Sequence, residues 1–321
     1  MHLPPYWNDD LYLSHYPDVK QAVTSGNFTT GWNHYKYYGC KEGRIDGYQL
    51  TEQDIQHHNL IKSSIKNLKT NYVIAVWSGD RRDNYKPYKN DPSHYLRAQI
   101  DSLVKNQHDL QQITIVVAHN PKEPVSFSNY LNSIPNTINS TKVSILHRDN
   151  YGQSYGSYSH AFYTYKKQFD YYIFIEDDYV FIKDNFDLEL ITYFKSAPNC
   201  GFLCSLVSGI SPDNSAPLHA SISNGITSYE VLEKIWEKFG RIPHDMERPT
   251  LSDDIKYSGN SQLSFSSAFL DAGYNLYDLT FKYQAPFVSV TSDRPNATLR
   301  TYAPHKKEQL IIPVQKNLEP Y

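Results

Sequence analysis

The sequence predicts an α/β protein in which helices flank a mostly parallel β-sheet. From residue 71 to 321, short apolar runs rich in β-branched and aromatic residues alternate with segments of helical periodicity. Such alternation is typical of a parallel sheet covered by helices. Residues 1–50 differ in composition, with regularly placed glycines and many aromatic residues, and indicate a small, mainly helical module. The polar stretch 51–70 is predicted to be a helix or linker between them.

The expected elements of the large domain follow one another along the chain. The predicted strands, each an apolar run of strand length, are 72–77, 113–118, 142–146 and 171–175. Apolar residues at helical spacing predict helices over 95–104, 158–169 and 229–239. Ligands of parallel sheets bind at the carboxyl ends of the strands. We therefore expect the functional residues within 77–82, 119–120, 148–154 and 176–179.

Composition excludes several classes of function. The 321 residues include 31 basic and 34 acidic side chains, a net charge of −3, which argues against a polycationic nucleic-acid binder. The three cysteines cannot all pair with one another, so a disulfide framework is not expected. Neither a leader-like N-terminus nor a long apolar run is visible, and we expect a cytoplasmic protein without a transmembrane segment.

Aromatic residues are unusually frequent, at 14% of the chain, with 28 tyrosines among them. A tyrosine ring suits both core packing and stacking on a sugar or base. Several aromatic residues lie where ligands are expected or in the N-terminal module: Trp77, Tyr151, Tyr155, Tyr158, Tyr179, Trp32, Tyr35, Tyr37 and Tyr38. From their positions, packing and ligand stacking are therefore about equally expected for these residues.

Three adjacent acids, Glu176, Asp177 and Asp178, directly follow the fourth predicted strand. Neighbouring carboxylates repel one another beside a buried strand unless a cation is present. Mg²⁺ or Mn²⁺ bound to a diphosphate prefers such oxygen ligands. The alternative is a solvated turn with helix-capping acids. A sugar nucleotidyltransferase is disfavoured, because the segment 78–82 lacks the Gly-rich loop that such an enzyme needs after its first strand.

The segment 171–186 around this triplet resembles the Asp-X-Asp region of GT-A glycosyltransferases, and 148–156 resembles the Asn-X-Gly loop of their family 2. The resemblance implies that Asp178 ligates the metal and that Glu176 and Asp177 reach the ribose or metal-bound water. It also implies nucleotide-sugar contacts from the loop after the first strand and from the Asn-X-Gly loop. The residues concerned are Trp77, Ser78, Gly79, Arg82, Asp149 and Asn150.

An inverting transfer also needs a carboxylate that accepts the proton of the acceptor hydroxyl. Family 2 enzymes place it about 11 to 12 residues before an Ala-Gly-Tyr, but counting back from the motif at 272–274 lands on Ser261 and Gln262. Asp253 and Asp254 instead resemble the Asp-Asp pair of the N-acetylglucosaminyltransferase I family, which implies Asp254, or else Asp253, as the base. A helix N-cap pair is the alternative for these two acids.

Further contacts are expected on the acceptor side and near the C-terminus. Ser223 and Asn224 precede the amphipathic helix and are candidates for hydrogen bonds to the acceptor sugar. Many GT-A enzymes use a C-terminal histidine as a further metal ligand, which implies His305. Arg294 is a candidate cation for the leaving diphosphate, where charge builds during transfer.

The N-terminal module has its own resemblance, to a short module of bacterial surface proteins and glycosyltransferases. Its pattern is carried by Tyr12, Leu13, Pro17, Asp18, Val19, Gly26, His34, Tyr35, Tyr38, Gly39, Glu42, Gly43 and Arg44. The combined expectation is an inverting, Mn²⁺- or Mg²⁺-dependent glycosyltransferase that moves a sugar from a nucleotide-diphosphate donor, UDP-linked by the resemblance, to a glycan hydroxyl. A retaining glycosyltransferase and a non-catalytic carbohydrate-binding or scaffold protein remain alternatives. The sequence indicates no oligomeric state.

Overall fold

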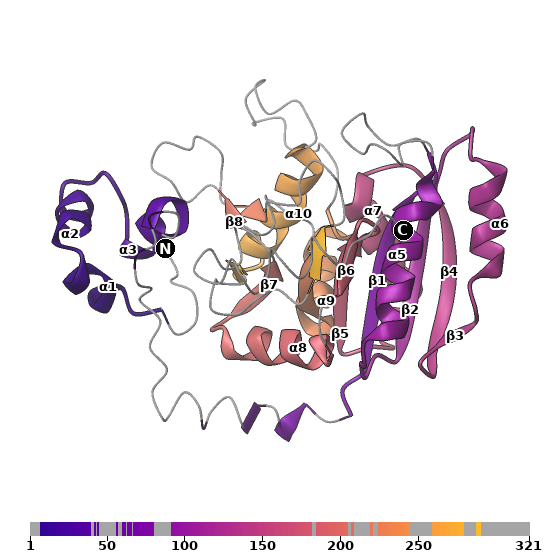
Figure 1. Ribbon diagram of the computed structural model, residues 1–321, viewed down its shortest axis with the longest axis horizontal. Helices are drawn as coiled ribbons and strands as arrows, with labels where there is room; N and C mark the ends of the chain where they lie inside the picture. Colours follow the sequence, from indigo (N-terminus) through magenta and orange to yellow (C-terminus); the bar gives the residue numbers. More distant parts are fainter. Residues whose placement is uncertain are drawn as a thin grey trace.

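An eight-stranded, mostly parallel sheet organises the large domain and confirms the predicted α/β class (Figure 1). The computed structural model describes residues 7–39, 42, 44, 56, 60–61, 63–65, 67–79, 91–181, 184–204, 207–208, 219–220, 224–243, 259–278 and 287–289. The strand order is β11-β7-β10-β5-β1-β2-β4-β3. Their bounds are β1 (Thr70–Trp77), β2 (Gln112–His119), β3 (Thr137–Ile138), β4 (Thr141–Asp149), β5 (Tyr171–Glu176), β7 (Cys200–Cys204), β10 (Gly225–Ser228) and β11 (Asn275–Asp278). Only β3 and β10 run against the others.

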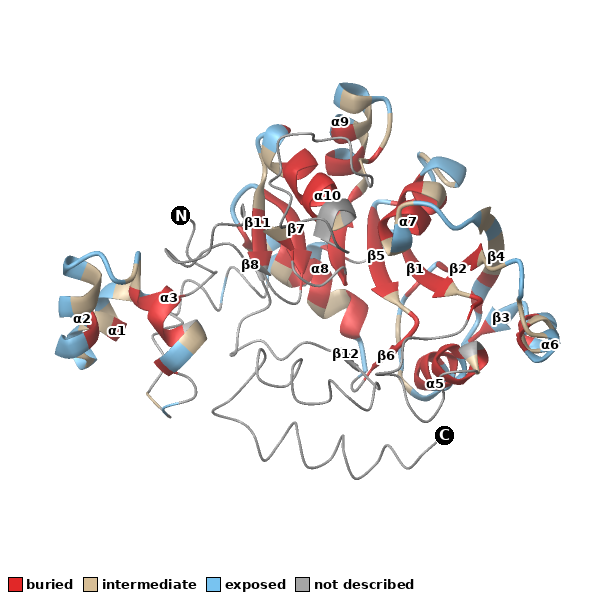
Figure 2. Ribbon diagram, turned by 90° about the horizontal axis from the view of Figure 1, so that it is seen from above, coloured by how far each residue is buried: buried red, intermediate tan, exposed pale blue. Residues whose placement is uncertain are grey.

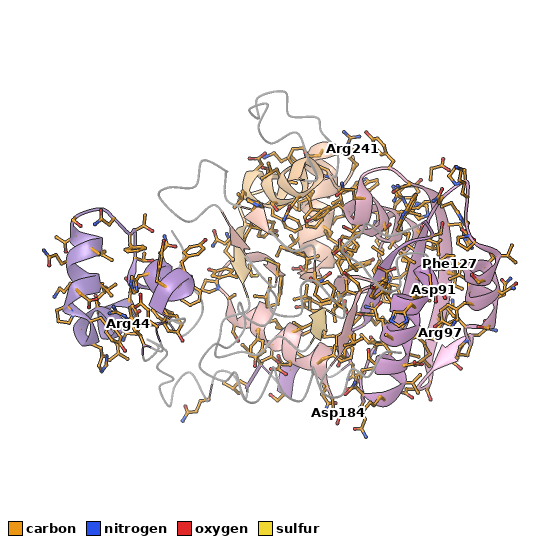
Figure 3. All side chains as sticks on the ribbon, turned by 45° about the horizontal axis from the view of Figure 1, so that its top comes forward. Arg44, Asp91, Arg97, Phe127, Asp184 and Arg241 are labelled. Atoms are coloured by element: carbon orange, nitrogen blue, oxygen red, sulfur yellow. The ribbon has the colours of Figure 1, made fainter. Side chains whose placement is uncertain are left out.

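Helices flank both faces of this sheet (Figure 2). One face carries α5 (Pro92–Lys105), α6 (Val125–Ser133) and α8 (Phe186–Ser196). The other carries α7 (Gln153–Thr164), α9 (Tyr229–Phe239) and α10 (Gly259–Asp271). Arg97 of α5 lies over the Tyr130 ring of α6 at 4.2 Å, and Phe127 of α6 is buried in the core (both Arg97 and Phe127 are labelled in Figure 3). Two small ribbons complete the described part: β6 (Tyr179–Phe181) with β12 (Phe287–Ser289), and β8 (Val207–Ser208) with β9 (His219–Ala220).

The central strands are apolar on both faces because both faces are covered. β1 and β2 are buried along all but their last residue, as expected for parallel strands between two helical layers. The α7 face is packed by aromatic rings, with Tyr158 stacked on Phe174 at 4.4 Å. Tyr155 and Tyr179 are also buried. Of the two roles weighed equally for Tyr155, Tyr158 and Tyr179, burial of all three rings favours packing.

Several elements differ from the expected ones. The helix predicted over 158–169 is α7, which begins at Gln153 after the left-handed Gly152 (φ 73°) and ends at Thr164. Glycine adopts this backbone conformation without steric cost, so the chain turns sharply from β4 into the helix. The strands β7 and β10 were not predicted, because neither short segment shows a pattern that separates it from a buried loop.

The N-terminal segment has its own aromatic core. It contains α1 (Asp9–His15), α2 (Pro17–Thr24), α3 (Gly31–His34) and the π-helix η1 (Tyr35–Gly39). Trp7, Tyr12, Val19, Trp32 and Tyr35 form a buried cluster that shares no residue with the core of the sheet. Trp32 and Tyr35 of the N-terminal module are thus packing residues, whereas the Tyr38 side chain is half exposed.

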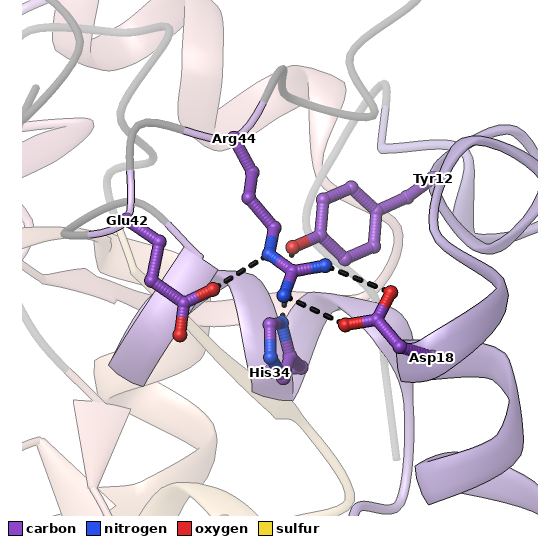
Figure 4. Close-up of polar contacts among 5 residues, drawn as sticks. All are labelled: Tyr12, Asp18, His34, Glu42 and Arg44. Carbon is purple, nitrogen blue, oxygen red and sulfur yellow. Dashed lines mark hydrogen bonds and ion pairs between the residues drawn. The ribbon is translucent and has the colours of Figure 1, made fainter.

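Arg44 closes this small core (Figure 4). Its guanidinium forms a two-pronged ion pair with Asp18 at 2.7 and 3.0 Å and bonds Glu42 at 2.6 Å. Behind it, the Tyr12 hydroxyl and His34 Nδ1 share a hydrogen bond of 3.0 Å. The hydrogen bond from Arg44 lowers the pKa of Asp18 from 3.8 to about 2. Most of the charged residues in the module pattern therefore hold its fold together.

No helix in the described ranges combines the length and apolar character needed to cross a membrane.

A buried carboxylate lies at the start of α8. Asp187 is 1% exposed, and its Oδ2 accepts the Asp109 N–H at 2.8 Å. Burial raises the pKa of Asp187 from 3.8 to about 6, against the opposing effect of backbone hydrogen bonds.

Replacement of Arg44 is predicted to loosen the module. In R44K, a single ammonium replaces the planar fork that matches the Asp18 carboxylate, so backbone amides of α1–α3 should exchange hydrogen faster in the full chain. K20A, at an exposed position of α2, is the matched control. Because the Asp18 pKa is depressed, the protection should be complete above about pH 4 and fall toward pH 2. Unchanged exchange in R44K would contradict this role.

Removing the charge of Asp187 is predicted to stabilise the protein at neutral pH. A carboxyl whose folded pKa is raised favours folding at low pH, and this advantage is lost as pH rises from about 4 through 6. D187N should therefore exceed the wild type in free energy of unfolding at pH 7.5, by up to about 3 kcal/mol, with little difference at pH 4. Urea titrations at both pH values measure this difference in free energy of unfolding. D101N, at an exposed position of α5, is the control. A pH-independent loss of stability in D187N would contradict the assignment.

Candidate functional site

The sheet has a point where the order of the strands reverses. From β1 the chain continues to β2 and then β4 on one side, and returns to β5 on the other side of β1. Ligands of open α/β sheets bind in the crevice at the carboxyl ends of the strands on either side of such a switch point. The candidate site therefore lies where β1 and β5 end.

The end of β1 is held tightly against β2. The Ser78 N–H donates to the carbonyl of Ala118 at 3.2 Å, and Ser78 Oγ accepts the N–H of Asn120 at 2.8 Å. A Cβ on Gly79 would overlap the Asn120 side chain and the Trp77 ring. Of the residues expected to contact the nucleotide sugar here, Ser78 and Gly79 are buried and Trp77 is half-buried.

The acidic triplet lies beside this loop. Strand register pairs Glu176 with Ala75, and the Asp177 N–H donates to the Ala75 carbonyl at 3.2 Å. Asp177 and Asp178 are only 2% and 6% exposed. The triplet is thus not the fully solvated turn that was the alternative expectation, and its two aspartates lie at the switch point.

Two side chains from distant segments hold Glu176 in place. The Glu176 N–H donates to Asn224 Oδ1 at 2.8 Å, and its carbonyl accepts from Gln99 Nε2 at 3.2 Å. Gln99 Nε2 also donates to the Tyr72 hydroxyl at 2.9 Å. Burial, with further contributions from the Glu176 and Cys204 charges, raises the pKa of Tyr155 well above its usual value. This glutamate is therefore fixed by its backbone and faces the α7 side of the sheet.

Asn224 was expected to contact the acceptor, but its side chain is fully buried at the end of β5. Its Nδ2 has no hydrogen-bond partner among the described residues. Since the amide oxygen is occupied by the Glu176 N–H, the geometry favours a positioning role over a direct contact with a sugar.

The loop after β4 supplies exposed polar groups at the same edge. Asp149 and Asn150 are exposed, as is most of the Tyr151 ring. Arg148 fixes the loop onto α7: its guanidinium donates to the Tyr151 carbonyl and to Ser157 Oγ, the latter at 3.3 Å. Burial lowers the pKa of Arg148, against the opposing charge of Asp149. Asp149 and Asn150 are therefore placed where a ligand above the sheet could reach them.

The donor set at the triplet suits a hard cation. Carboxylate oxygens removed from water are the ligands that Mg²⁺ or Mn²⁺ prefers. Within the described ranges, however, no group of three or more His, Cys, Asp or Glu side chains is arranged to hold a metal ion. A complete set of ligands would need groups from elsewhere in the chain, from substrate or from water.

Six expected site residues lie outside the described residues: Arg82, Ser223, Asp253, Asp254, Arg294 and His305. The two halves of the predicted site therefore differ. The structure brings together the ends of β1 and β5, whereas the predicted catalytic base, the C-terminal metal ligand and the diphosphate cation stay predictions.

One polar cluster at this edge was not predicted. His119, at the end of β2, bonds Glu123 through Nδ1 and His147 through Nε2, both at 2.7 Å. The sequence placed His119 directly after the predicted strand 113–118, where functional residues were expected, but its partners depend on strand register and on the turn into α6.

Removing the Asn224 amide is predicted to cost stability at the site. N224A leaves the buried Glu176 N–H without its acceptor, which should lower the free energy of unfolding by about 1–3 kcal/mol in urea titrations. N132A, at an exposed position of α6, should change it by less than about 0.5 kcal/mol. Equal effects of the two substitutions would contradict the positioning role.

No protein-family model matches this chain, and no curated protein matches it. Among solved structures it is similar to TarS from S. aureus (11% identity, TM-score 0.40), covering 71% of this chain and 38% of that one. The 1-349 segment of TarS in complex with UDP is 11% identical, with a TM-score of 0.39; the similarity covers 66% of this chain and 58% of that one. The 4-diphosphocytidyl-2C-methyl-D-erythritol synthase from Anaerococcus prevotii DSM 20548 is 10% identical, with a TM-score of 0.42. The similarity covers 76% of this chain and 97% of that one. The chain thus spans less than two thirds of the TarS chains, and similarities this low carry no argument about its activity.

Proposed function

We propose that this chain is a metal-dependent glycosyltransferase of the GT-A type. It would transfer a sugar from a nucleotide-diphosphate donor, with UDP as the expected nucleotide, to a hydroxyl of a glycan. The observation that carries the proposal is the acidic triplet, with both of its aspartates buried, at the point where the strand order reverses, beside the end of β1. The resemblance of 171–186 to an Asp-X-Asp region supplies the reaction class.

The described residues suggest a division of the ligand. The end of β1 and the loop after β4 would take the nucleotide, with Trp77, Ser78, Gly79, Asp149 and Asn150 around it. The donor diphosphate would then lie over β5. The hydrogen bonds that hold Ser78 in place support this division, because a fixed backbone loses little conformational entropy when a ligand binds.

Asp178 would hold Mn²⁺ or Mg²⁺, with His305 as a further ligand and Glu176 and Asp177 toward the ribose or metal-bound water. Such an ion, when bound, supplies positive charge for the diphosphate leaving group. Burial of the two aspartates supports this assignment, since carboxylates removed from water gain most from a nearby cation. Arg82 and Arg294 are further candidates for the donor, and Ser223 for the acceptor.

Proton transfer from the acceptor hydroxyl would fall to Asp254 or Asp253 in an inverting reaction. A retaining reaction needs no such base and stays the alternative within the same class. In either case the buried position of Asn224 behind Glu176 favours other residues as the contacts of the acceptor.

The proposal is tested by donor hydrolysis. With Mn²⁺ and a panel of sugar nucleotides, the wild type should release nucleotide diphosphate, and D178A should be slower by about 100-fold or more, because the charge on the leaving group is no longer offset. D101A, an exposed aspartate of α5, should match the wild type. NMR of the product anomer then separates inversion from retention.

A different result would identify the alternative class. Binding of a glycan without turnover of any donor and without metal-dependent nucleotide binding would indicate a carbohydrate-binding or scaffold protein on the same fold. Turnover that survives unchanged in D178A would overturn the assignment of the metal site while keeping the enzyme class.

A further inference from the structure

A chain of three titratable side chains lies at the carboxyl edge of the sheet, on the face covered by α5 and α6. Glu123 Oε2 is 2.7 Å from His119 Nδ1, and His119 Nε2 is 2.7 Å from His147 Nδ1. The two imidazole planes are nearly parallel, 10° apart, with their ring centroids 4.8 Å apart. Glu123 is itself anchored, because Oε1 accepts from Ser128 Oγ at 2.6 Å.

The hydrogen-bond network assigns the protons of this chain. Burial alone would raise the pKa of Glu123, but hydrogen bonds from Ser128, His119 and Ser78 lower it below its usual range. The Glu123 carboxylate therefore accepts the Nδ1–H of His119. In the neutral ring Nε2 is then an acceptor, so it receives the Nδ1–H of His147. One proton thus lies between the two facing ring nitrogens, and the free lone pair of the His147 ring is on its Nε2.

A transition-metal ion can take the position of that proton. Zn²⁺ binds imidazole nitrogens at about 2.0–2.1 Å, which places two nitrogens of one tetrahedral ion about 3.3 Å apart. Small rotations of the two rings would open the 2.7 Å separation to this value. The side chain of His119 is 40% exposed and His147 is exposed, so the rings have room to turn and water can complete the coordination.

The surroundings also favour a cation. A carboxylate that accepts the second N–H of a ligating histidine is the usual outer partner at zinc sites, and Glu123 occupies this position behind His119. Asp149 is the register partner of His119 in the parallel pairing of β2 with β4, and therefore lies on the same face. Its exposed carboxylate adds negative charge beside the two rings.

We propose that His119 Nε2 and His147 Nδ1 form a site for a divalent transition-metal ion of the zinc class, with Glu123 orienting His119. Binding moves the His147 proton from Nδ1 to Nε2, so that the neutral ring offers its Nδ1 lone pair to the metal and no net proton is released. Imidazole nitrogens distinguish this site from the carboxylate oxygens of the triplet, which suit Mg²⁺ or Mn²⁺. The inference is independent of the proposed transferase activity.

The test is calorimetric titration of the tag-free full chain with Zn²⁺, in the absence of Mn²⁺ and nucleotide. The wild type should bind one more zinc ion than H119A or H147A. E123Q should bind this ion about 10–100-fold more weakly, because the outer carboxylate is lost. H160A, on α7 at the opposite face of the sheet, should keep the wild-type stoichiometry and affinity.

Each outcome decides the proposal. Loss of the same zinc ion in both histidine variants, with circular dichroism showing that they remain folded, supports it. If the wild type binds no zinc, or if either histidine variant binds zinc as the wild type does, the pair is only a hydrogen bond between two strands. Neither result depends on turnover of a sugar nucleotide, so failure here leaves the Asp178 experiment unaffected.

Discussion

The arrangement of this sheet's functional edge depends on one hydrogen bond, from the Glu176 N–H to the Asn224 amide. A carboxylate triplet at a buried strand end has no reason to keep one conformation, because its charges repel one another. Asn224 and Gln99 remove that freedom by occupying the N–H and the carbonyl of the same residue. The backbone of Glu176 is thereby fixed at the end of β5, beside the end of β1.

Along this edge, some residues are fixed by hydrogen bonds and others are exposed. Ser78, Asn120 and Glu123 are tied to one another or to neighbouring backbone, and Arg148 fastens the loop after β4 to α7. The exposed groups, Asp149 and Asn150, extend from these fixed supports. Precise placement of a ligand requires such support, because a side chain on an unsupported loop loses conformational entropy when it binds.

Local sequence pattern predicted much of this fold because the parallel strands are long enough to show it. The runs at 72–77 and 171–175 identify β1 and β5, and with them the position of the acidic triplet. The role of Asn224 could not be predicted, since its partner is 48 residues away and is a backbone N–H. The contact of His119 with His147 spans 28 residues and depends on strand register. Tyr158 was ambiguous for a related reason: packing and stacking use the same ring face.

The reversed direction of β10 has a consequence for how the edge is built. Parallel strands present only their outgoing ends at this edge, so each contributes the loop that follows it. Because β10 runs the other way, it meets β5 with its incoming end, and Asn224 arrives just ahead of it. The segment that leads into β10 thus supports the segment that follows β5. The loop before β10 and the loop after β5 can therefore each vary in length without moving the other.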